Sequence, residues 1–371
     1  MDYYALPGNI INADYFRRFR RNGAALKYLE KAMWGKKPQC PFCGCKSAGK
    51  WNRENWYRCN NYRCNRPFNA RTKTIFQCTK IPLWKWFLAC YYMLPTKGIT
   101  GIRLAHELGV TRKTAWHMAH RIREAMKGSR ERLLLEKLGG IIELDEIYPG
   151  GKEGNKPAYK KLHMGSGVGG KMSALGVVER GDHGNAITTG FPDKLALNKK
   201  GKLIPTANIS AKFIRKSLRQ CVKPGSTIAN TDSSPLYGDL KRIGFMEHFK
   251  VDHSNGIYVK KVNHPLMEKA YTNGAESRWR IIKDEYRNHQ WYSRWHSQSY
   301  YNESDFRWNQ TRVFKRGKDG VLRFVDRMPT KNAFDILLKD CFGKTLTWNK
   351  LAARKKVYMK KLNKTMGYVY S

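Results

Sequence analysis

Three carboxylates of this chain lie where chemistry could use them. Asp145 follows the apolar run IIEL, Asp232 ends the stretch TIANTD, and Glu276 lies in the segment NGAESRWRIIKDEY. The first two stretches have the pattern of strands, and the third has the apolar spacing of a helix with one buried side. Carboxylates at adjacent strand ends, joined by one from a helix packed across them, can hold Mg²⁺. Two such ions, roughly 4 Å apart, can activate an attacking hydroxyl and stabilise the leaving oxygen of a phosphodiester.

Each carboxylate also has a purely structural explanation. Asp145 fits the exposed end of a strand, and Asp232 fits the start of the turn TDSSP. Glu276 fits an ion pair with Arg280 on a solvated helix face. Taken singly, each acid is better explained by these roles. Their order within one segment favours the metal site.

The letters ELDE place two further glutamates beside Asp145. If Ile142 and Leu144 point into the core, strand alternation puts Glu143 and Asp145 on one face and Glu146 on the other. We interpret both glutamates as bystanders or residues of an outer layer. Glu146 is the closer candidate because it adjoins the end of the strand.

Four cysteines have the spacing of structural zinc ligands. Cys40 and Cys43 form a CxxC in CPFCGC, and Cys59 and Cys64 form a wider pair after the stretch KWNRENWYR, which predicts a small hairpin. Four thiolates in a tetrahedron hold a structural Zn²⁺ and leave no position open for catalysis. Cys45 is a spare thiol, and unrelated cysteines in a small basic domain are the alternative. The other four cysteines are expected to be buried packing residues.

The charge of the chain indicates a polyanionic partner. It has 71 Lys and Arg against 29 Asp and Glu, a formal net charge of +42. Nucleic acid is the leading candidate, since Lys and Arg supply most non-specific affinity for phosphates. A ribosomal or membrane-surface protein would share this bias. We expect no membrane association, because no signal peptide is visible and the apolar run IPLWKWFLACYYML is short for a span.

Residues 98–126 predict two helices around the letters LGVT. Gly109 ends the first helix and Thr111 caps the second. This arrangement is similar to a helix-turn-helix, whose second helix enters a major groove. An ordinary helical hairpin with a basic solvated face is the alternative. The predicted DNA contacts of the second helix are Arg112, Lys113, His117 and Arg121.

Several strand patterns and one intervening helix follow residue 139. The sequence GGIIELDEIY, SALGVVER, NAITTGF and STIANTD reads as strands, and ISAKFIRKSLRQCV reads as a helix. Strands interrupted by a helix predict an α/β domain. A tail rich in Lys and Arg follows residue 310 and is a candidate nucleic-acid contact.

These features, in this order, resemble the zinc-ribbon DDE transposases of bacterial insertion sequences, the ISXO-like group related to eukaryotic Merlin elements. The similarity runs from about residue 15 to 312. Its blocks are CPFCGC with YRCNNYRC, GITGIRLAHELGVTRKTAWHMAHRIREAM, IIELDEIYPGGKEGNK, STIANTDSSPLYGDL, YTNGAESRWRIIK and HSQSYYNESDFRWNQ. The chain departs from the pattern in its wider second cysteine pair and in an apparent insertion, KKVNHPLMEKAY.

The resemblance implies a ribonuclease H-like α/β domain, a mixed five-strand sheet with helices on both faces. It implies that Asp145, Asp232 and Glu276 are catalytic and hold Mg²⁺ or Mn²⁺, and that Lys283 contacts a DNA phosphate. Water would free a 3′-OH at the element end, and that hydroxyl would attack target DNA. The implied partners are terminal inverted repeats, target DNA and further copies of the chain, at least a dimer on two ends.

The expected organisation has four parts. They are an N-terminal region with the zinc ribbon (1–78), a helical DNA-binding region (79–135), the catalytic domain (136–312) and a basic C-terminal extension (313–371). The expected location is the bacterial cytoplasm at the nucleoid, or the nucleus for a eukaryotic source. The alternatives are a DNA-binding protein of transposase ancestry that has lost cleavage, and a structural nucleoprotein. The acidic triad favours the active enzyme.

Overall fold

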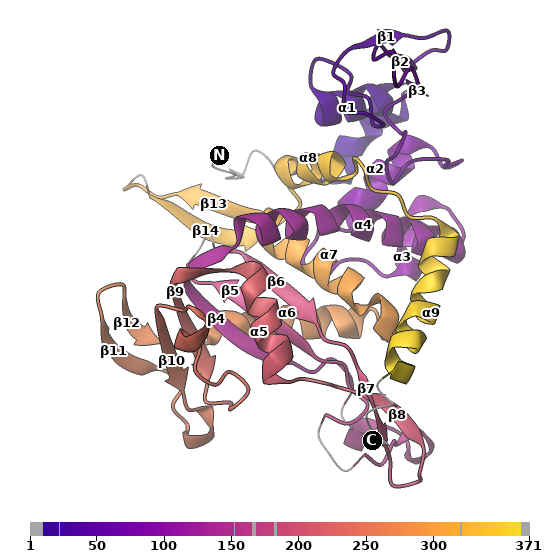
Figure 1. The fold of residues 1–371 in the computed structure, drawn as a ribbon. Coiled ribbons are helices and arrows are strands. Elements are labelled where there is room, and N and C mark those ends of the chain that lie inside the picture. The colour runs from indigo at the N-terminus through magenta and orange to yellow at the C-terminus, as the bar shows by residue number, and fades with distance from the viewer. Residues whose placement is uncertain are drawn as a thin grey trace. The chain divides into compact units, whose positions relative to one another are not determined.

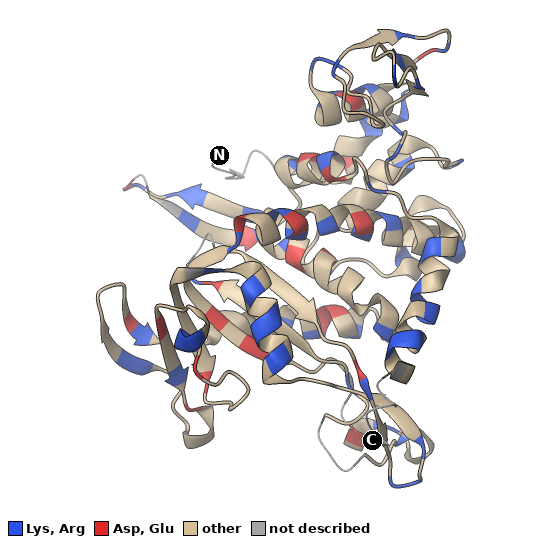
Figure 2. Cartoon of the chain, in the orientation of Figure 1, with Lys and Arg blue, Asp and Glu red and all other residues tan. Residues whose placement is uncertain are grey.

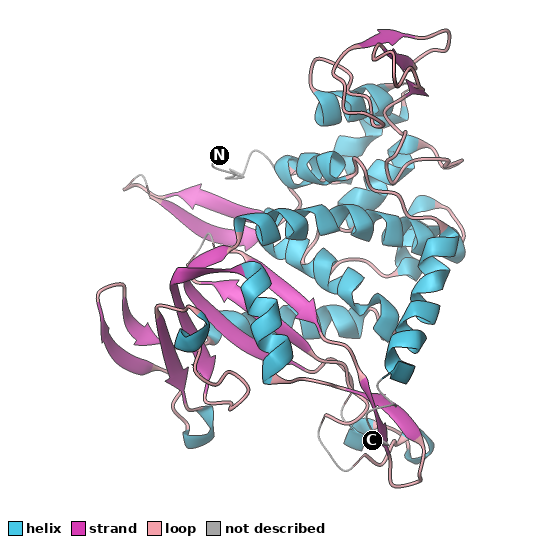
Figure 3. Cartoon of the chain, in the orientation of Figure 1, coloured by secondary structure: helices cyan, strands magenta, loops and turns pink. Residues whose placement is uncertain are grey.

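The structure is a computed structural model that describes residues 10–21, 23–151, 153–164, 168–181, 184–319 and 321–364. Contacts divide the chain into two compact units (Figure 1). The first comprises Met1–Ser129 and Phe306–Trp348, and the second comprises Arg130–Asp305 and Asn349–Ser371. Helices dominate the first unit, and the largest sheet belongs to the second (Figure 3).

A mixed five-strand sheet forms the centre of the second unit. The strand order is β10-β9-β4-β5-β6. The first strand in sequence, β4, pairs antiparallel with β5 and parallel with β9, which in turn pairs parallel with β10. This order and these directions confirm the predicted ribonuclease H-like fold. The strands are β4 (Leu138–Ile147), β5 (Ala174–Glu179), β6 (Ala186–Gly190), β9 (Val222–Asp232) and β10 (Glu247–Val251).

Helices cover both faces of this sheet, because side chains alternate between the faces along β4. Ile142 and Leu144 pack with Ile214 and Leu218 of α5 (Ala211–Cys221). Ile147 packs on the opposite face with apolar residues of α6 (Asn273–Asn288) and of the α7 helix (Ser297–Gln310). Ser210 caps α5 by accepting from the backbone N–H of Phe213, which confirms the predicted helix at this place.

Two hairpins extend from this unit. The first joins β7 (Lys194–Leu197) to β8 (Leu203–Thr206). The second joins β11 (Lys260–His264) to β12 (Met267–Ala270), and it corresponds to the segment that the sequence marks as an insertion. The remaining elements of the unit are α9 (Trp348–Lys364, from Asn349 on) and the 3-10 helices η3 (Glu153–Asn155), η4 (Ala158–Lys160), η5 (Lys241–Ile243), η6 (His253–Asn255) and η7 (Arg294–His296).

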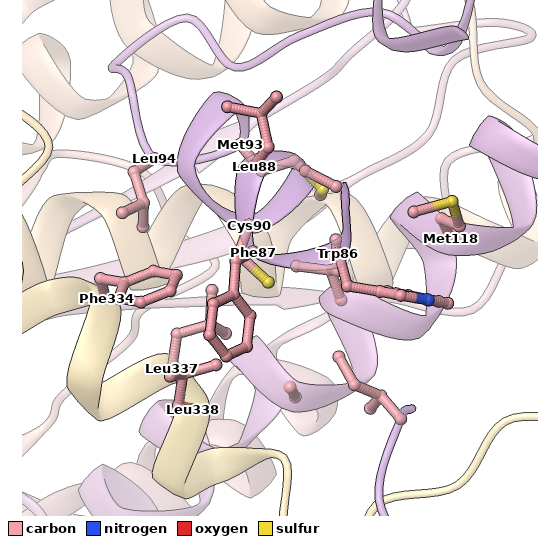
Figure 4. Close-up of a cluster of buried hydrophobic side chains, with 14 of the residues drawn as sticks. Trp86, Phe87, Leu88, Cys90, Met93, Leu94, Met118, Phe334, Leu337 and Leu338 are labelled. Atoms are coloured by element: carbon pink, nitrogen blue, oxygen red, sulfur yellow. The ribbon is translucent and has the colours of Figure 1, made fainter. Parts of the chain in front are cut away.

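The first unit is built around one apolar core to which both ends of the chain contribute. Trp86, Phe87 and Cys90 of α2 are buried together with Phe334 and other apolar residues of α8 (Figure 4). The apolar run that is too short for a membrane span thus forms a buried helix. The helices of the first unit are η2 (Ala13–Arg20), α1 (Ala24–Trp34), α2 (Leu83–Tyr92), α3 (Gly101–Leu108), α4 (Arg112–Glu136, up to Ser129) and α8 (Lys331–Asp340).

Short strands complete the first unit. The strands β1 (Ala48–Lys50), β2 (Tyr57–Cys59) and β3 (Pro67–Phe68) form a small antiparallel sheet. The β1–β2 pair confirms the hairpin predicted between the cysteine pairs. The strands β13 (Arg312–Arg316) and β14 (Leu322–Arg327) form a second hairpin. Within the described part of the chain, no helix is both long and apolar enough to cross a membrane.

Candidate active site and zinc-binding cysteines

The parallel pairing of β4 and β9 brings two of the predicted acids together. Glu143 lies opposite Asn230 in this pair, so Asp145 and Asp232, each two residues further on, reach the same edge of the sheet. Carboxylate oxygens of Asp145, Asp232 and Glu146 all lie within 4.8 Å of one another. Three carboxylates therefore converge at one end of the sheet, in an arrangement suited to a divalent cation.

Asp145 is held by two hydrogen bonds. Its Oδ2 accepts from the indole N–H of Trp279 at 2.7 Å, and its Oδ1 accepts from the backbone N–H of Glu146 at 2.8 Å. Its pKa is raised to about 6, chiefly by burial and also by the negative charges of Asp232 and Glu276, while the two hydrogen bonds oppose the rise. Asp232 is fixed separately, because its Oδ1 accepts from the backbone N–H of Ser234 at 3.0 Å.

Glu146 is a member of this group that the sequence interpretation placed outside it. Strand alternation points its side chain away from the Asp145 face, as predicted, but the two carboxylates meet at the sheet edge, beyond the last residue of β4 that pairs with β9. The pKa of Glu146 is raised to about 7, chiefly by burial and also by the charges of Asp232 and Asp145. Burial raises the pKa of the neighbouring Tyr237 hydroxyl, and the charge of Glu146 adds to that rise.

Glu276 lies in the first turn of α6 and outside the group of three oxygens. Its side chain is 50% exposed, and its Oε1 is 3.8 Å from Nδ1 of His253. It is near enough for its charge to contribute to the raised pKa of Asp145. The structure thus brings Asp145 and Asp232 together and leaves Glu276 beside them, so its role as a ligand stays a prediction.

Glu143, interpreted from the sequence as a bystander or a residue of an outer layer, is deeply buried. The residue is 1% exposed, and its carboxylate accepts from the backbone N–H groups of Gly274 and Ala275, at 2.6 and 3.1 Å. It also forms an ion pair with Arg180 at 3.1 Å. Burial raises its pKa, and Arg180 opposes that shift. The alternation that places Glu143 on the Asp145 face was visible in the sequence, but its partners were not.

A cavity of about 970 Å³ adjoins the acidic group. Glu146 lines it together with Lys283, the residue predicted to contact a DNA phosphate. Most other charged residues of its lining are basic, and several are aromatic. They include Lys156, Lys171, Arg287, Tyr148, Tyr286 and Trp291. Positive side chains thus lie beside the carboxylates, where a polyanion would pass.

The predicted helix pair is present, but its second helix is long and mostly buried. Thr111 caps α4, because its Oγ1 accepts from the backbone N–H of Thr114 at 3.2 Å. Arg112 and Lys113 are exposed. His117 is half-buried, and its ring lies 5.5 Å from the ring of Trp348.

Arg121 has a structural use within the first unit. It is 8% exposed, donates to the backbone carbonyl of Gln77 at 2.7 Å and lies over the ring of Trp86. Its burial argues against the predicted DNA contact in this conformation, because a guanidinium in the core cannot reach a phosphate. The periodicity of the α4 sequence showed its apolar positions. It could not show that basic positions such as Arg121 are also covered by the rest of the first unit.

Exposed basic residues gather on two helices of the second unit. Lys and Arg follow the outer side of α5 and recur along α9 (Figure 2). The exposed cations of α5 are Lys212, Arg215, Lys216 and Arg219, and those of α9 include Lys355, Lys356, Lys360 and Lys361. These surfaces carry much of the excess positive charge of the sequence and suit phosphate contacts.

The four predicted zinc ligands converge in the first unit. Their sulfurs all lie within 4.8 Å of one another. The Sγ atoms of Cys40 and Cys64 are 3.7 Å apart, and those of Cys43 and Cys59 are 3.5 Å apart. Sulfurs bound tetrahedrally at about 2.3 Å from a zinc ion would be about 3.8 Å apart. The thiols therefore have nearly the spacing that Zn²⁺ requires.

Two turns present these sulfurs. Gly44 has φ +76° and follows the first pair, with its N–H bonded to the carbonyl of Cys40 at 2.9 Å. The wider second pair is accommodated by a turn in which Asn61 accepts from the N–H of Cys64 at 2.9 Å. The sulfur of Cys45 contacts Ser47 and lies outside the group of four. Burial raises the pKa of Cys59 to about 12, so deprotonation of this thiol calls for a strong positive partner.

Two protein families match the sequence. Residues 137–309 match the ISXO2-like transposase domain, and this range includes the converging carboxylates and Glu276. Residues 21–67 match the transposase zinc-ribbon domain, which includes the four cysteines. A curated relative, the "Uncharacterized protein in transposable element ISH50" of Halobacterium salinarum, is 29% identical over 126 residues.

That match spans 33% of this chain and 40% of the relative, so the chain covers less than half of the relative's length. No solved structure matches the chain. Both family matches fall on the segments that the sequence resemblance named, and the relative comes from a transposable element. Residues 21–67 therefore form a transposase zinc-ribbon domain, and residues 137–309 form an ISXO2-like transposase domain.

Proposed function

We propose that this chain is an active DNA transposase that cleaves the ends of its element and joins them to target DNA, with divalent ions at the carboxylate group. The observation that carries the proposal is the convergence of Asp145, Asp232 and Glu146 at the edge of a ribonuclease H-like sheet. Partly buried carboxylates this close repel one another, and a hard cation that prefers oxygen ligands relieves this repulsion.

The donor set fits Mg²⁺ or Mn²⁺. Asp145 and Asp232 would hold the ions, and Glu276 would complete one coordination shell from the start of α6. When bound, a pair of ions supplies an activated hydroxyl and stabilises the leaving oxygen. Trp279 keeps the Asp145 carboxylate oriented toward the group. We expect no covalent protein–DNA intermediate, because carboxylates rather than a serine or tyrosine nucleophile occupy the site.

The DNA path proposed here follows the exposed cations. Lys283 lines the cavity next to Glu146 and is suited to a phosphate close to the cleaved bond. Arg112 and Lys113 remain the candidates on the helix pair, with His117 partly covered beside them. The partners would be terminal inverted repeats and target DNA. At least two copies of the chain would be needed to hold two ends, at the nucleoid in a bacterium or in the nucleus of a eukaryote.

The four cysteines would hold a structural Zn²⁺. All four would then be thiolates, and the closed tetrahedral shell would leave no position for water or substrate. The ion would fix the relative positions of the two cysteine turns and of the short strands between them. Domain roles follow from this assignment: the zinc ribbon and the helix pair bind DNA, and the ribonuclease H-like domain performs the chemistry.

A cleavage assay tests this function. The full chain is incubated with end-labelled DNA that carries the terminal repeats of its element, with Mg²⁺ or Mn²⁺, beside Asp232→Asn. We expect metal-dependent nicking and joined products for the wild type and none for the variant. If both proteins bind the DNA and neither cuts it, the chain is a DNA-binding protein of transposase ancestry instead.

A further inference from the structure

The carboxylate of Glu143 ties the strand of the first acid to the helix of the predicted third acid. Glu143 lies on β4 two residues before Asp145 and on the same face. Its Oε2 accepts from the N–H groups of Gly274 and Ala275 in the first turn of α6. These are two of the N–H groups that a helix leaves unpaired at its start, and a negative charge there is favourable.

The closeness of this contact depends on a glycine. A Cβ added at Gly274 would lie 2.8 Å from Oε2 of Glu143 and 3.3 Å from its Cδ. Glu143 is buried and its carboxylate is hydrogen-bonded on both oxygens, so it has little freedom to move aside. Gly274 thus allows the backbone of α6 to approach β4 two residues before Glu276.

Arg180 completes the link from the other side of Glu143. Its Nε donates to Oε1 of Glu143 at 3.1 Å, and its other two nitrogens donate to the carbonyls of Lys269 and Tyr271 at 2.9 and 3.0 Å. The guanidinium also lies 3.7 Å from the centre of the Tyr271 ring. One cation therefore fixes the segment that enters α6, and one carboxylate fixes the start of α6 itself.

We propose that Glu143, through Gly274 and Arg180, is a positioning residue that sets Glu276 at the distance from Asp145 needed to share a divalent ion. This inference rests on the proposed function. Glu276 lies three residues after Asn273, the first residue of α6. A displacement of the first helical turn therefore moves the Glu276 carboxylate directly. A buried pair with only a structural role would change stability and leave the metal site of the folded protein unaltered.

Two variants disturb this link and leave Asp145, Asp232 and Glu276 unchanged. Glu143→Gln replaces one accepting oxygen by an NH₂ group that faces an N–H or guanidinium donor. Gly274→Ala adds a methyl group against the carboxylate from the opposite side. Asp193→Asn is the matched control, because Asp193 is a similarly buried acid of the same unit, paired with Arg294 at 2.8 Å and hydrogen-bonded by the hydroxyl of Tyr358 at 2.7 Å.

The experiment uses the full chain and measures two quantities: Mn²⁺ binding by calorimetry, and the cleavage rate as a function of Mn²⁺ concentration. Both are measured at temperatures where circular dichroism shows that each protein is folded. Glu143→Gln and Gly274→Ala should each weaken Mn²⁺ binding by about 10-fold to 100-fold, with a matching rise in the Mn²⁺ needed for cleavage. Asp193→Asn should match wild type in both. Adding Glu143→Gln to Glu276→Gln should cause no further loss, since the positioned carboxylate is already gone.

The outcomes separate this inference from the proposed function. If the wild type binds Mn²⁺ and cleaves, and both variants behave like Asp193→Asn, the positioning role is wrong and the transposase assignment stands. If the losses of Glu143→Gln and Glu276→Gln multiply, Glu143 acts by a route other than Glu276 and the inference is equally wrong. If the wild-type protein neither binds Mn²⁺ nor cleaves DNA, both the positioning role of Glu143 and the proposed transposase function are wrong.

Discussion

The indole N–H of Trp279 donates a 2.7 Å hydrogen bond to Oδ2 of Asp145, so the helix that carries Glu276 also orients the first acid. The same indole packs against β5 so closely that a Cβ at Gly176 would lie 2.2 Å from Cη2 of Trp279. Strand, helix and carboxylate are thus fixed by one side chain.

Trp279→Phe should disturb Asp145 without removing it. Loss of the hydrogen bond disfavours the charged carboxylate, so the pKa of Asp145 should rise further above its ordinary value. Metal-dependent cleavage should therefore require a higher pH, and the free energy of unfolding should fall by about 2 kcal/mol. Rate–pH profiles and urea unfolding measure these effects. Trp295→Phe is the control, and an unchanged profile for Trp279→Phe would contradict the orienting role.

The acidic group should destabilise the metal-free protein at neutral pH. The folded-state pKa values of Asp145 and Glu146 are raised to about 6 and about 7, so the folded chain holds protons that the unfolded chain releases. This contribution makes stability fall as the pH rises from about 4 to about 7.

Asp145→Asn removes the titrating group and should raise the melting temperature at pH 8 relative to wild type. The gap should close toward pH 4, and Mg²⁺ should stabilise only the wild type at pH 8. Thermal unfolding across this pH range checks the sign. A variant that melts below the metal-free wild type at pH 8 would contradict the account.

Glu146 and Glu276 can be compared directly as ligands. Glu146 has a carboxylate oxygen within 4.8 Å of oxygens of Asp145 and Asp232, whereas Glu276 lies outside that group. We expect Glu146→Gln to weaken Mn²⁺ binding measurably in the absence of DNA. We expect Glu276→Gln to abolish cleavage and to weaken Mn²⁺ binding to the free protein at least as much as Glu143→Gln does. Calorimetry and cleavage assays separate these effects, and a Glu146→Gln protein with wild-type binding would remove Glu146 from the site.

The cysteine cluster predicts bound zinc, and the nearby Cys45 provides a control residue outside the cluster. Freshly purified, reduced protein should contain bound zinc, Cys59→Ser should lose most of it, and Cys45→Ser should retain it because Cys45 lies outside the group. Elemental analysis measures the metal. Since ribbons of this kind depend on their ion for folding, Cys59→Ser should also make residues 40–68 sensitive to protease. Zinc-free wild-type protein would contradict the assignment.

Local sequence patterns predicted the parts of the site that depend on local structure. Apolar runs ending in Asp145 and Asp232 indicated two strand ends, and their parallel pairing brings these ends to one edge. The CxxC turn and the hairpin after it likewise follow from short-range spacing, and the structure confirms the sheet predicted by the family resemblance.

The remaining features depend on contacts between distant segments. Periodicity could not show that Glu143 would bond to Gly274, which lies 131 residues away. Nor could it show that Arg121 is covered in a core where α8, from the basic tail, packs with α2. A burial pattern predicts which side chains face inward, but the partner on the other side comes from tertiary packing.

The most direct test of the central claim is the product formed at the element end. Full-length protein, labelled terminal-repeat DNA and Mn²⁺ are incubated together, and the cut strand is analysed for a free 3′-OH, beside Asp145→Asn and Asp232→Asn. The account predicts a 3′-OH end in the wild type alone, dependent on Mn²⁺ and lost with EDTA. Cleavage that persists in either variant, or that proceeds in EDTA, would contradict it.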